Sequence, residues 1–153
     1  MNVGAIAWPW VASVAPTDTL ERAVWRMREF DVGCVAVIED RELVGIVTER
    51  DLLRAASDGI SPKNVIVRDY MTYDPVTVSS DEDVVDAAAV MTAVGARHLP
   101  VLDGDEVVGM LSIRDLLPVI SDGRIVNLMR RRATSGRRRQ PRIGSRAIPE
   151  AAL

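Results

Sequence analysis

The strongest constraint on the fold of this chain is an internal repeat. Residues 14–53 and 78–117 align without a gap at an offset of 64, and 11 of the 40 aligned pairs are identical. The two copies also end alike. Residues 45–51 read Gly-Ile-Val-Thr-Glu-Arg-Asp, residues 109–115 read Gly-Met-Leu-Ser-Ile-Arg-Asp, and Leu-Leu follows each. Such a repeat indicates one supersecondary unit used twice, with the units packed on each other. A pocket built from one copy should therefore have a pseudo-symmetric twin.

Each copy is expected to follow the order β-α-β-β-α. In the first copy, Asp18 and Glu21 have capping-box spacing, and apolar residues recur at helical spacing up to Phe30. A polar turn at residues 39–42 separates two short apolar runs, which is typical of a β-hairpin, and Thr48 opens a second helix. The second copy repeats this plan. The predicted fold class is therefore α/β (α+β), with two pseudo-twofold-related repeats.

The chain is predicted to have four parts. They are repeat 1 with an apolar lead-in (residues 1–60), a linker (61–75), repeat 2 (76–128) and an Arg-rich tail (129–153). Each repeat, at about 50 residues, would be marginally stable alone, so we expect one hydrophobic core shared by both. The formal net charge of −3 hides an asymmetry, because residues 1–129 carry −10 and the remainder holds eight arginines and one acid. This tail lacks apolar periodicity and is expected to be disordered.

Cysteine content and hydropathy limit the class of protein. The single cysteine, Cys34, excludes an intramolecular disulfide framework and fits a reducing cytoplasm. No apolar run reaches the roughly 18 residues that span a membrane, and no basic flank precedes the apolar residues 3–15. We therefore expect a cytoplasmic protein with neither a membrane span nor a signal peptide. The sequence shows no nucleophile–base pair and no metal-ligand spacing, so we expect neither an enzyme nor a metal site.

Two further segments carry a resemblance to a known family. Residues 70–78 read Tyr-Met-Thr-Tyr-Asp-Pro-Val-Thr-Val, and residues 97–103 read Arg-His-Leu-Pro-Val-Leu-Asp. Together with the two Gly-x-x-[Thr/Ser]-x-x-Asp endings, they resemble a tandem pair of CBS domains, the Bateman module, over about residues 10–122. The resemblance implies two small sheets with helices and adenosyl ligands (AMP, ADP, ATP or S-adenosylmethionine) in clefts between the copies. It also implies that two such pairs form a homodimer, a disk of four copies.

The first copy departs from the family pattern at two places. Residues 8–13 replace the usual Met-Thr start, and Gly33-Cys34 stands where the second copy has Arg97-His98. The resemblance makes Arg97 and His98 the best candidates for binding phosphate. A guanidinium grips phosphate oxygens with its fork of donors, and an imidazole adds a donor whose charge depends on pH. The alternative is an exposed arginine and a half-buried histidine without a ligand.

The endings of the two repeats supply the other polar candidates, Thr48 with Asp51 and Ser112 with Asp115. A carboxylate can accept hydrogen bonds from both ribose hydroxyls, as acidic residues do in dinucleotide folds. A hydroxyl at a helix start can face a phosphate, and in the resembled family these positions serve both purposes. The alternative is a purely local capping box, which stabilises a helix by about 1 kcal/mol without any ligand. Both can hold at once.

The adenine ring needs an apolar slot, and the family seats it near the residues that start each repeat. Val14, Thr77 and Val78 are therefore candidates, with an ordinary place in the core as the alternative. Gly45 and Gly109 lie inside apolar strands, where a missing Cβ would let the backbone approach a flat base. The alternative is that each glycine marks a β-bulge or a place where two backbone segments cross closely.

These observations predict an adenine-nucleotide sensor that signals to an unidentified effector protein through a shift between conformations. We expect no cofactor apart from the regulatory adenosyl ligand. One alternative is a structural or protein-interaction module with no ligand. Another is a nucleic-acid binder, because the arginines of the tail could neutralise phosphates.

Overall fold

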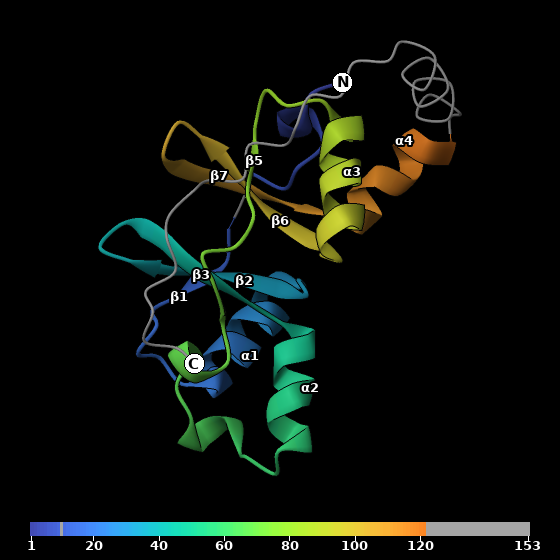
Figure 1. Cartoon of the computed structure of the whole chain (residues 1–153). Helices are drawn as coiled ribbons and strands as arrows, with labels where there is room; N and C mark the ends of the chain where they lie inside the picture. Colours follow the sequence, from blue (N-terminus) through green and yellow to red (C-terminus); the bar gives the residue numbers. More distant parts are fainter. Residues whose placement is uncertain (10, 122–153) are drawn as a thin grey trace.

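The computed structural model describes residues 1–9 and 11–121 (Figure 1). This part of the chain forms two similar bodies, each a small sheet with helices, which confirms the predicted α+β class. The predicted Arg-rich tail, residues 129–153, lies outside the described residues. The nucleic-acid alternative, which depends on that tail, therefore stays a prediction.

The first repeat has the expected β-α-β-β-α order. Its elements are β1 (Ser13–Val14), α1 (Leu20–Phe30), β2 (Cys34–Glu39), β3 (Glu42–Thr48) and α2 (Glu49–Ser57). Strands β2 and β3 form the predicted antiparallel hairpin, with Asp40 and Arg41 at positive φ in the turn. Strand β1 lies parallel to β2. The sheet order is β1-β2-β3-β4, in which β4 (Thr72–Tyr73) comes from the linker.

The second repeat copies the first down to its irregularities. Its elements are β5 (Val78–Ser79), α3 (Val84–Val94), β6 (His98–Asp103), β7 (Glu106–Ser112), the 3-10 turn η4 (Ile113–Leu116) and α4 (Leu117–Ser121). Both hairpins slip in register at equivalent places, between Val37 and Ile38 and between Val101 and Leu102. Three more 3-10 turns precede or connect the repeats: η1 (Val3–Ala5), η2 (Pro62–Asn64) and η3 (Val67–Asp69).

The start of α1 differs from the prediction by one residue. The helix is capped by Thr19, whose hydroxyl oxygen accepts the Arg22 N–H at 3.3 Å. Asp18 instead accepts the Ala15 N–H at 2.8 Å and so tightens the preceding turn. The predicted capping box of Asp18 and Glu21 is therefore wrong, because a nearer hydroxyl takes the role of cap.

The segment that precedes each repeat covers the sheet of the other repeat. Ahead of the first repeat, Trp8 pairs with Met110 of β7. Ahead of the second repeat, Thr72 of β4 pairs with Ile46 of β3. The offset of 64 relates Trp8 to Thr72 and Ile46 to Met110, so this exchange obeys the same pseudo-twofold relation as the repeats. The lead-in expected to belong to repeat 1 therefore hydrogen-bonds to repeat 2.

The hydrophobic interior forms two clusters rather than the predicted shared core. Val3, of the lead-in, is fully buried in the cluster of the second repeat. Val67, its equivalent in the linker, is fully buried in the cluster of the first repeat, together with Tyr70 and Met71. The expectation of a single core is wrong because each repeat completes its own core with the segment that it receives. The repeats are thus tied together by exchanged segments.

Candidate functional site

The Thr48–Asp51 motif forms a capping box at the start of α2. Oδ2 of Asp51 accepts the Thr48 N–H at 2.8 Å and the Thr48 hydroxyl at 3.1 Å. The other oxygen, Oδ1, lies 3.5 Å from Nη1 of Arg54. Asp51 is only 5% exposed, and both of its oxygens have partners. A ribose could bind here only by displacing one of these partners.

The Ser112–Asp115 motif also forms a capping box, but its carboxylate is more open. Oδ2 of Asp115 accepts the Ser112 N–H at 2.6 Å, and the Ser112 hydroxyl oxygen accepts the Arg114 N–H at 3.2 Å. Asp115 is half-buried, and within the described part of the chain no hydrogen bond or ion pair engages its Oδ1. The capping alternative therefore holds for both motifs, and the second leaves one carboxylate oxygen for a ligand.

Arg97 and His98 lie beside the second capping box. His98 is half-buried and pairs with Ser112 in the β6–β7 register, and Arg97 is exposed. Burial lowers the pKa of His98, and the guanidinium of Arg97 lowers it further. The carboxylates of Glu49 and Asp115 oppose this shift, and Arg114 adds to it. The lowered pKa makes the imidazole mainly neutral at pH 7, with one N–H to donate.

Glu49 is a member of this cluster that the sequence analysis did not single out. It belongs to the first repeat, yet its charge acts on His98 of the second, so the cluster spans both repeats. Its carboxylate lies over Gly33, where an added Cβ would be 3.0 Å from Oε2 of Glu49. The offset of 64 aligns Glu49 with Ile113. This difference between an acidic and an apolar residue in the two repeats could have marked Glu49 as a candidate from the sequence alone.

The equivalent positions of the first repeat, Gly33 and Cys34, supply no cation. Cys34 is buried, and burial raises the pKa of its thiol to about 12, with a smaller contribution from the charge of Asp51. Cys34 is therefore protonated at neutral pH and behaves as a small buried apolar residue. A phosphate near Thr48 would meet Glu49 instead of the basic pair that the second repeat offers.

The candidates for the adenine slot lie largely inside the fold. Val14 and Val78 are buried members of the first and second hydrophobic clusters, respectively. Thr77 is half-buried at the start of the second repeat. The structure therefore gives the two valines an ordinary core role. Their contact with an adenine ring stays a prediction.

Gly45 and Gly109 mark places where two backbone segments cross closely. A Cβ on Gly45 would lie 2.8 Å from both the carbonyl oxygen of Thr72 and Sδ of Met71. A Cβ on Gly109 would lie 2.6 Å from the carbonyl oxygen of Trp8. The exchanged segments thus fill the space that the glycines leave, and the tight-crossing alternative accounts for both residues. Their assignment to adenine stays a prediction.

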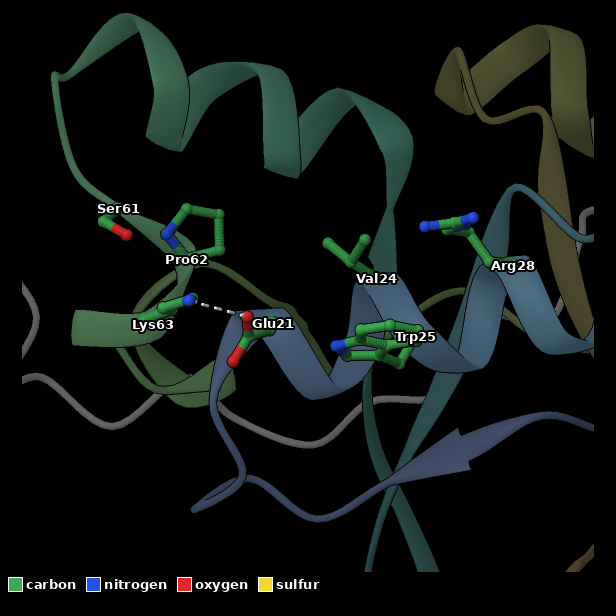
Figure 2. A pocket seen from close by; sticks show the side chains of 7 residues that line it. All are labelled: Glu21, Val24, Trp25, Arg28, Ser61, Pro62 and Lys63. Carbon is green, nitrogen blue, oxygen red and sulfur yellow. Dashed lines mark ion pairs between the residues drawn. The ribbon is translucent and has the colours of Figure 1, made fainter.

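A shallow groove of about 270 Å³ lies between α1 and η2 (Figure 2). Trp25 is 58% exposed there, and the guanidinium of Arg28 lies 5.6 Å from the centre of its ring. Lys63 and Glu21 form an ion pair at 3.7 Å across one end. None of the predicted ligand residues lines this groove, which is formed by Glu21, Val24, Trp25, Arg28, Ser61, Pro62 and Lys63. The groove belongs to an exposed helical face, and it shares no residue with the cluster of Glu49, Arg97, His98 and Asp115.

Among residues 1–9 and 11–121, no group of three or more His, Cys, Asp or Glu side chains could hold a metal ion. No helix in the same part of the chain is long and apolar enough to cross a bilayer. Every buried side-chain nitrogen or oxygen described there has a hydrogen-bond partner.

The model of the CBS domain family matches the chain twice, over residues 5–58 and 67–122. The chain belongs to the CBS-domain family. Each match contains one of the capping-box motifs, and the second also contains Arg97 and His98. The predicted CBS pair is therefore confirmed.

Relatives of this CBS pair include both uncharacterized and ligand-bound proteins. An uncharacterized protein of Methanopyrus kandleri is 35% identical over 122 residues, covering 78% of this chain and 62% of that protein. The chain thus spans less than two thirds of that relative. A CBS domain protein from Pyrobaculum aerophilum, solved in complex with AMP, is 27% identical with a TM-score of 0.71, covering 76% and 90% of the two chains. A protein with CBS domains from Burkholderia ambifaria is 33% identical with a TM-score of 0.70, covering 73% and 83%.

Proposed function

We propose that this CBS pair binds an adenine nucleotide, such as AMP, at its second repeat and acts as a regulatory module. One observation carries the proposal: Asp115 keeps one carboxylate oxygen outside its capping box, beside Arg97 and His98. The complex of the Pyrobaculum aerophilum relative with AMP supports the ligand class. ADP, ATP and S-adenosylmethionine are the competing adenosyl ligands.

Each polar group of the second repeat has a role in this proposal. The ribose hydroxyls donate to Asp115, while the exposed guanidinium of Arg97 binds phosphate oxygens through two of its donors. Neutral His98 donates one N–H, and the Ser112 hydroxyl turns its proton toward the phosphate. Residues 1–129 carry a net charge of −10, which repels nucleotides at a distance. The local cations must therefore supply the attraction.

The regulatory output requires a protein surface, and the helices offer one. Leu53 and Leu117 occupy equivalent positions and are 71% and 58% exposed. Phe30 and Val94 form a second equivalent pair of exposed apolar residues, and Trp25 is exposed nearby on α1. We propose that these helices pack against a second copy to form a homodimer. An effector protein would then respond to the conformation that the ligand favours.

A ligand panel tests the binding proposal. AMP, ADP, ATP, S-adenosylmethionine and adenosine are compared by thermal shift and by isothermal titration calorimetry. A ligand at about 100 times its Kd should add roughly 2.7 kcal/mol to the free energy of unfolding and raise Tm by several degrees. Asp115→Ala should abolish this response. Arg97→Ala should weaken AMP binding far more than adenosine binding, and equal losses would contradict the phosphate role of Arg97.

A specific observation also favours a second candidate, a structural or protein-interaction module without a ligand. Both Asp51 and Asp115 serve their own capping boxes, so each has a use that needs no nucleotide. In that case no adenosyl compound shifts Tm. The protein would then act only by binding other proteins through the exposed apolar residues of its helices.

A further inference from the structure

Arg54 connects the first capping box to the linker. One of its nitrogens, Nη1, lies 3.5 Å from Oδ1 of Asp51, and the other, Nη2, donates to the carbonyl oxygen of Tyr70 at 2.8 Å. The guanidinium lies 5.3 Å from the centre of the Tyr70 ring. The Tyr70 hydroxyl donates to Asp58 at 2.8 Å, near the end of α2. Arg54 thus joins the capping carboxylate to the linker, and Tyr70 joins the linker to the far end of the helix.

The linker residues that Arg54 holds also cover the first sheet. Met71 follows Tyr70 and places its sulfur against Gly45 of β3. Strand β4 then pairs with β3 before the chain rises to the second repeat, as the green segment in Figure 1 shows. The contact between Arg54 and Tyr70 therefore lies at the start of the stretch that connects the repeats.

Among residues 1–9 and 11–121, no arginine bridge of this kind is seen in the second repeat. The residue equivalent to Arg54 is Pro118, which carries no side-chain cation. The two aspartates consequently differ in one respect that matters for a ribose. Both give Oδ2 to the capping box, but Oδ1 of Asp51 faces Arg54, whereas no described ion pair or hydrogen bond engages Oδ1 of Asp115.

We propose that Arg54 closes the first repeat to adenosyl ligands. By pairing with Asp51 and with the linker at Tyr70, it reserves the carboxylate for the fold and leaves one open ribose site per chain. The proposal rests on the proposed function, because it assigns the ligand to one of the two repeats. Removing the cation of Arg54 should give Asp51 the same free oxygen that Asp115 has, and so create a second site.

The test uses adenosine as the probe, because adenosine has the ribose hydroxyls but no phosphate. Because adenosine needs no phosphate-binding cation, the lack of a basic residue at positions 33 and 34 does not weaken its binding at the first repeat. In calorimetric titrations, the native chain should bind one adenosine and Arg54→Met should bind two. Asp115→Ala should weaken adenosine binding at least about 10-fold, which is about 1.4 kcal/mol. Adding Arg54→Met to Asp115→Ala should restore binding to within about 3-fold of the native Kd.

Arg22→Met is the matched control, because it removes an exposed arginine from α1, away from Asp51. Combined with Asp115→Ala, it should restore nothing. If Arg54→Met does not fold, Arg54→Gln replaces it, since an amide can still donate to the Tyr70 carbonyl without pairing with Asp51 as a cation. This variant should also bind two adenosines.

The outcomes separate the two proposals. If the native chain binds neither adenosine nor AMP, the proposed function fails. If the native chain already binds two adenosines, or binds one while neither Arg54 variant gains a second site, the role of Arg54 fails and nucleotide binding at the second repeat stands.

Discussion

Asp51 and Asp115 occupy equivalent positions in the two repeats but have different surroundings. Each accepts a backbone N–H in its own capping box. Asp51 is also paired with Arg54 and is nearly inaccessible, whereas Asp115 is half-buried next to the cluster of Arg97 and His98. The same short motif therefore lies in a closed environment in one repeat and in an open one in the other.

This difference shows that a four-residue motif does not by itself define a binding site. The residue three positions after the aspartate decides whether its second oxygen has an ionic partner, and this residue is Arg54 in one repeat and Pro118 in the other. The residue just before β2 or β6 decides whether a cation lies near the capping box. This residue is Gly33 in the first repeat and Arg97 in the second. The two repeats thus keep the same order of elements, while these positions give their aspartates different surroundings.

The largest effect is expected where the exchanged segment crosses the second sheet. Gly109→Ala should lower the free energy of unfolding by about 3 kcal/mol, because the new Cβ would meet the Trp8 carbonyl oxygen at 2.6 Å. Urea denaturation measures this loss. Gly33→Ala is the control and should cost under about 1 kcal/mol, because its nearest neighbour is the mobile end of the Glu49 side chain. Similar losses for the two variants would show that the crossing is loose.

The next effect separates the two aspartates by stability. Asp51→Ala should lower the free energy of unfolding by about 2 kcal/mol, because it removes the acceptor of both the Thr48 N–H and the Thr48 hydroxyl. Asp115→Ala should cost about 1 kcal/mol, since that carboxylate is more exposed and has fewer partners. Thermal unfolding without ligand provides the comparison. A larger loss for Asp115→Ala would reverse the assignment of the closed and open repeats.

A smaller effect is expected at the ends of the first helix of each repeat. Helix α1 ends at Asp31 with φ of 53°, and α3 ends at Gly95 with φ of 67°, both in the left-handed region. Asp31→Gly should therefore stabilise the protein by about 0.5 kcal/mol, and Gly95→Ala should destabilise it by about 1 kcal/mol. Nothing lies within 4 Å of a Cβ added at Gly95, so the loss would be a backbone effect. Differential scanning calorimetry detects both changes, and a gain for Gly95→Ala would contradict this explanation.

The smallest effect concerns pH. His98 is the single histidine of the chain, and its pKa in the folded protein is lowered from 6.5. Between the lowered pKa and 6.5, the unfolded chain therefore binds more protons than the folded protein. The free energy of unfolding should fall as the pH drops from above 6.5 toward the folded pKa. The loss should level off below that pKa. Urea titrations between about pH 7.5 and 5.5 measure this dependence. His98→Gln should flatten it, and an unchanged slope in this variant would assign the effect to other groups.

Much of the fold could be predicted because the signals were local. The apolar period of α1 and the polar turn after β2 gave the first helix and hairpin, and the repeat transferred them to the second half. The cap at Thr19 was missed because Asp18 beside it has an equally suitable side chain. The role of the lead-in could have been found by extending the offset of 64, which pairs Val3 with Val67.

The candidate site was less predictable because its decisive contacts are distant in sequence. The motifs located Asp51 and Asp115, and the capping-box alternative correctly described their hydrogen bonds. The bridge from Arg54 to Tyr70 joins residues 16 positions apart and has no periodic signature. The effect of Glu49 on His98 crosses between the repeats, so it requires the packing of the whole module.

The exchange of covering segments has a consequence for synthesis on the ribosome. The first repeat can complete its sheet as soon as residue 73 has emerged, because its covering strand follows it directly. Trp8 emerges much earlier, but its partner Met110 is among the last described residues to be made. Trp8 must therefore wait, without its partner strand, until β7 has been made. A bulky insertion next to Trp8 should accordingly disturb the second repeat more than the first, although the first is nearer in sequence.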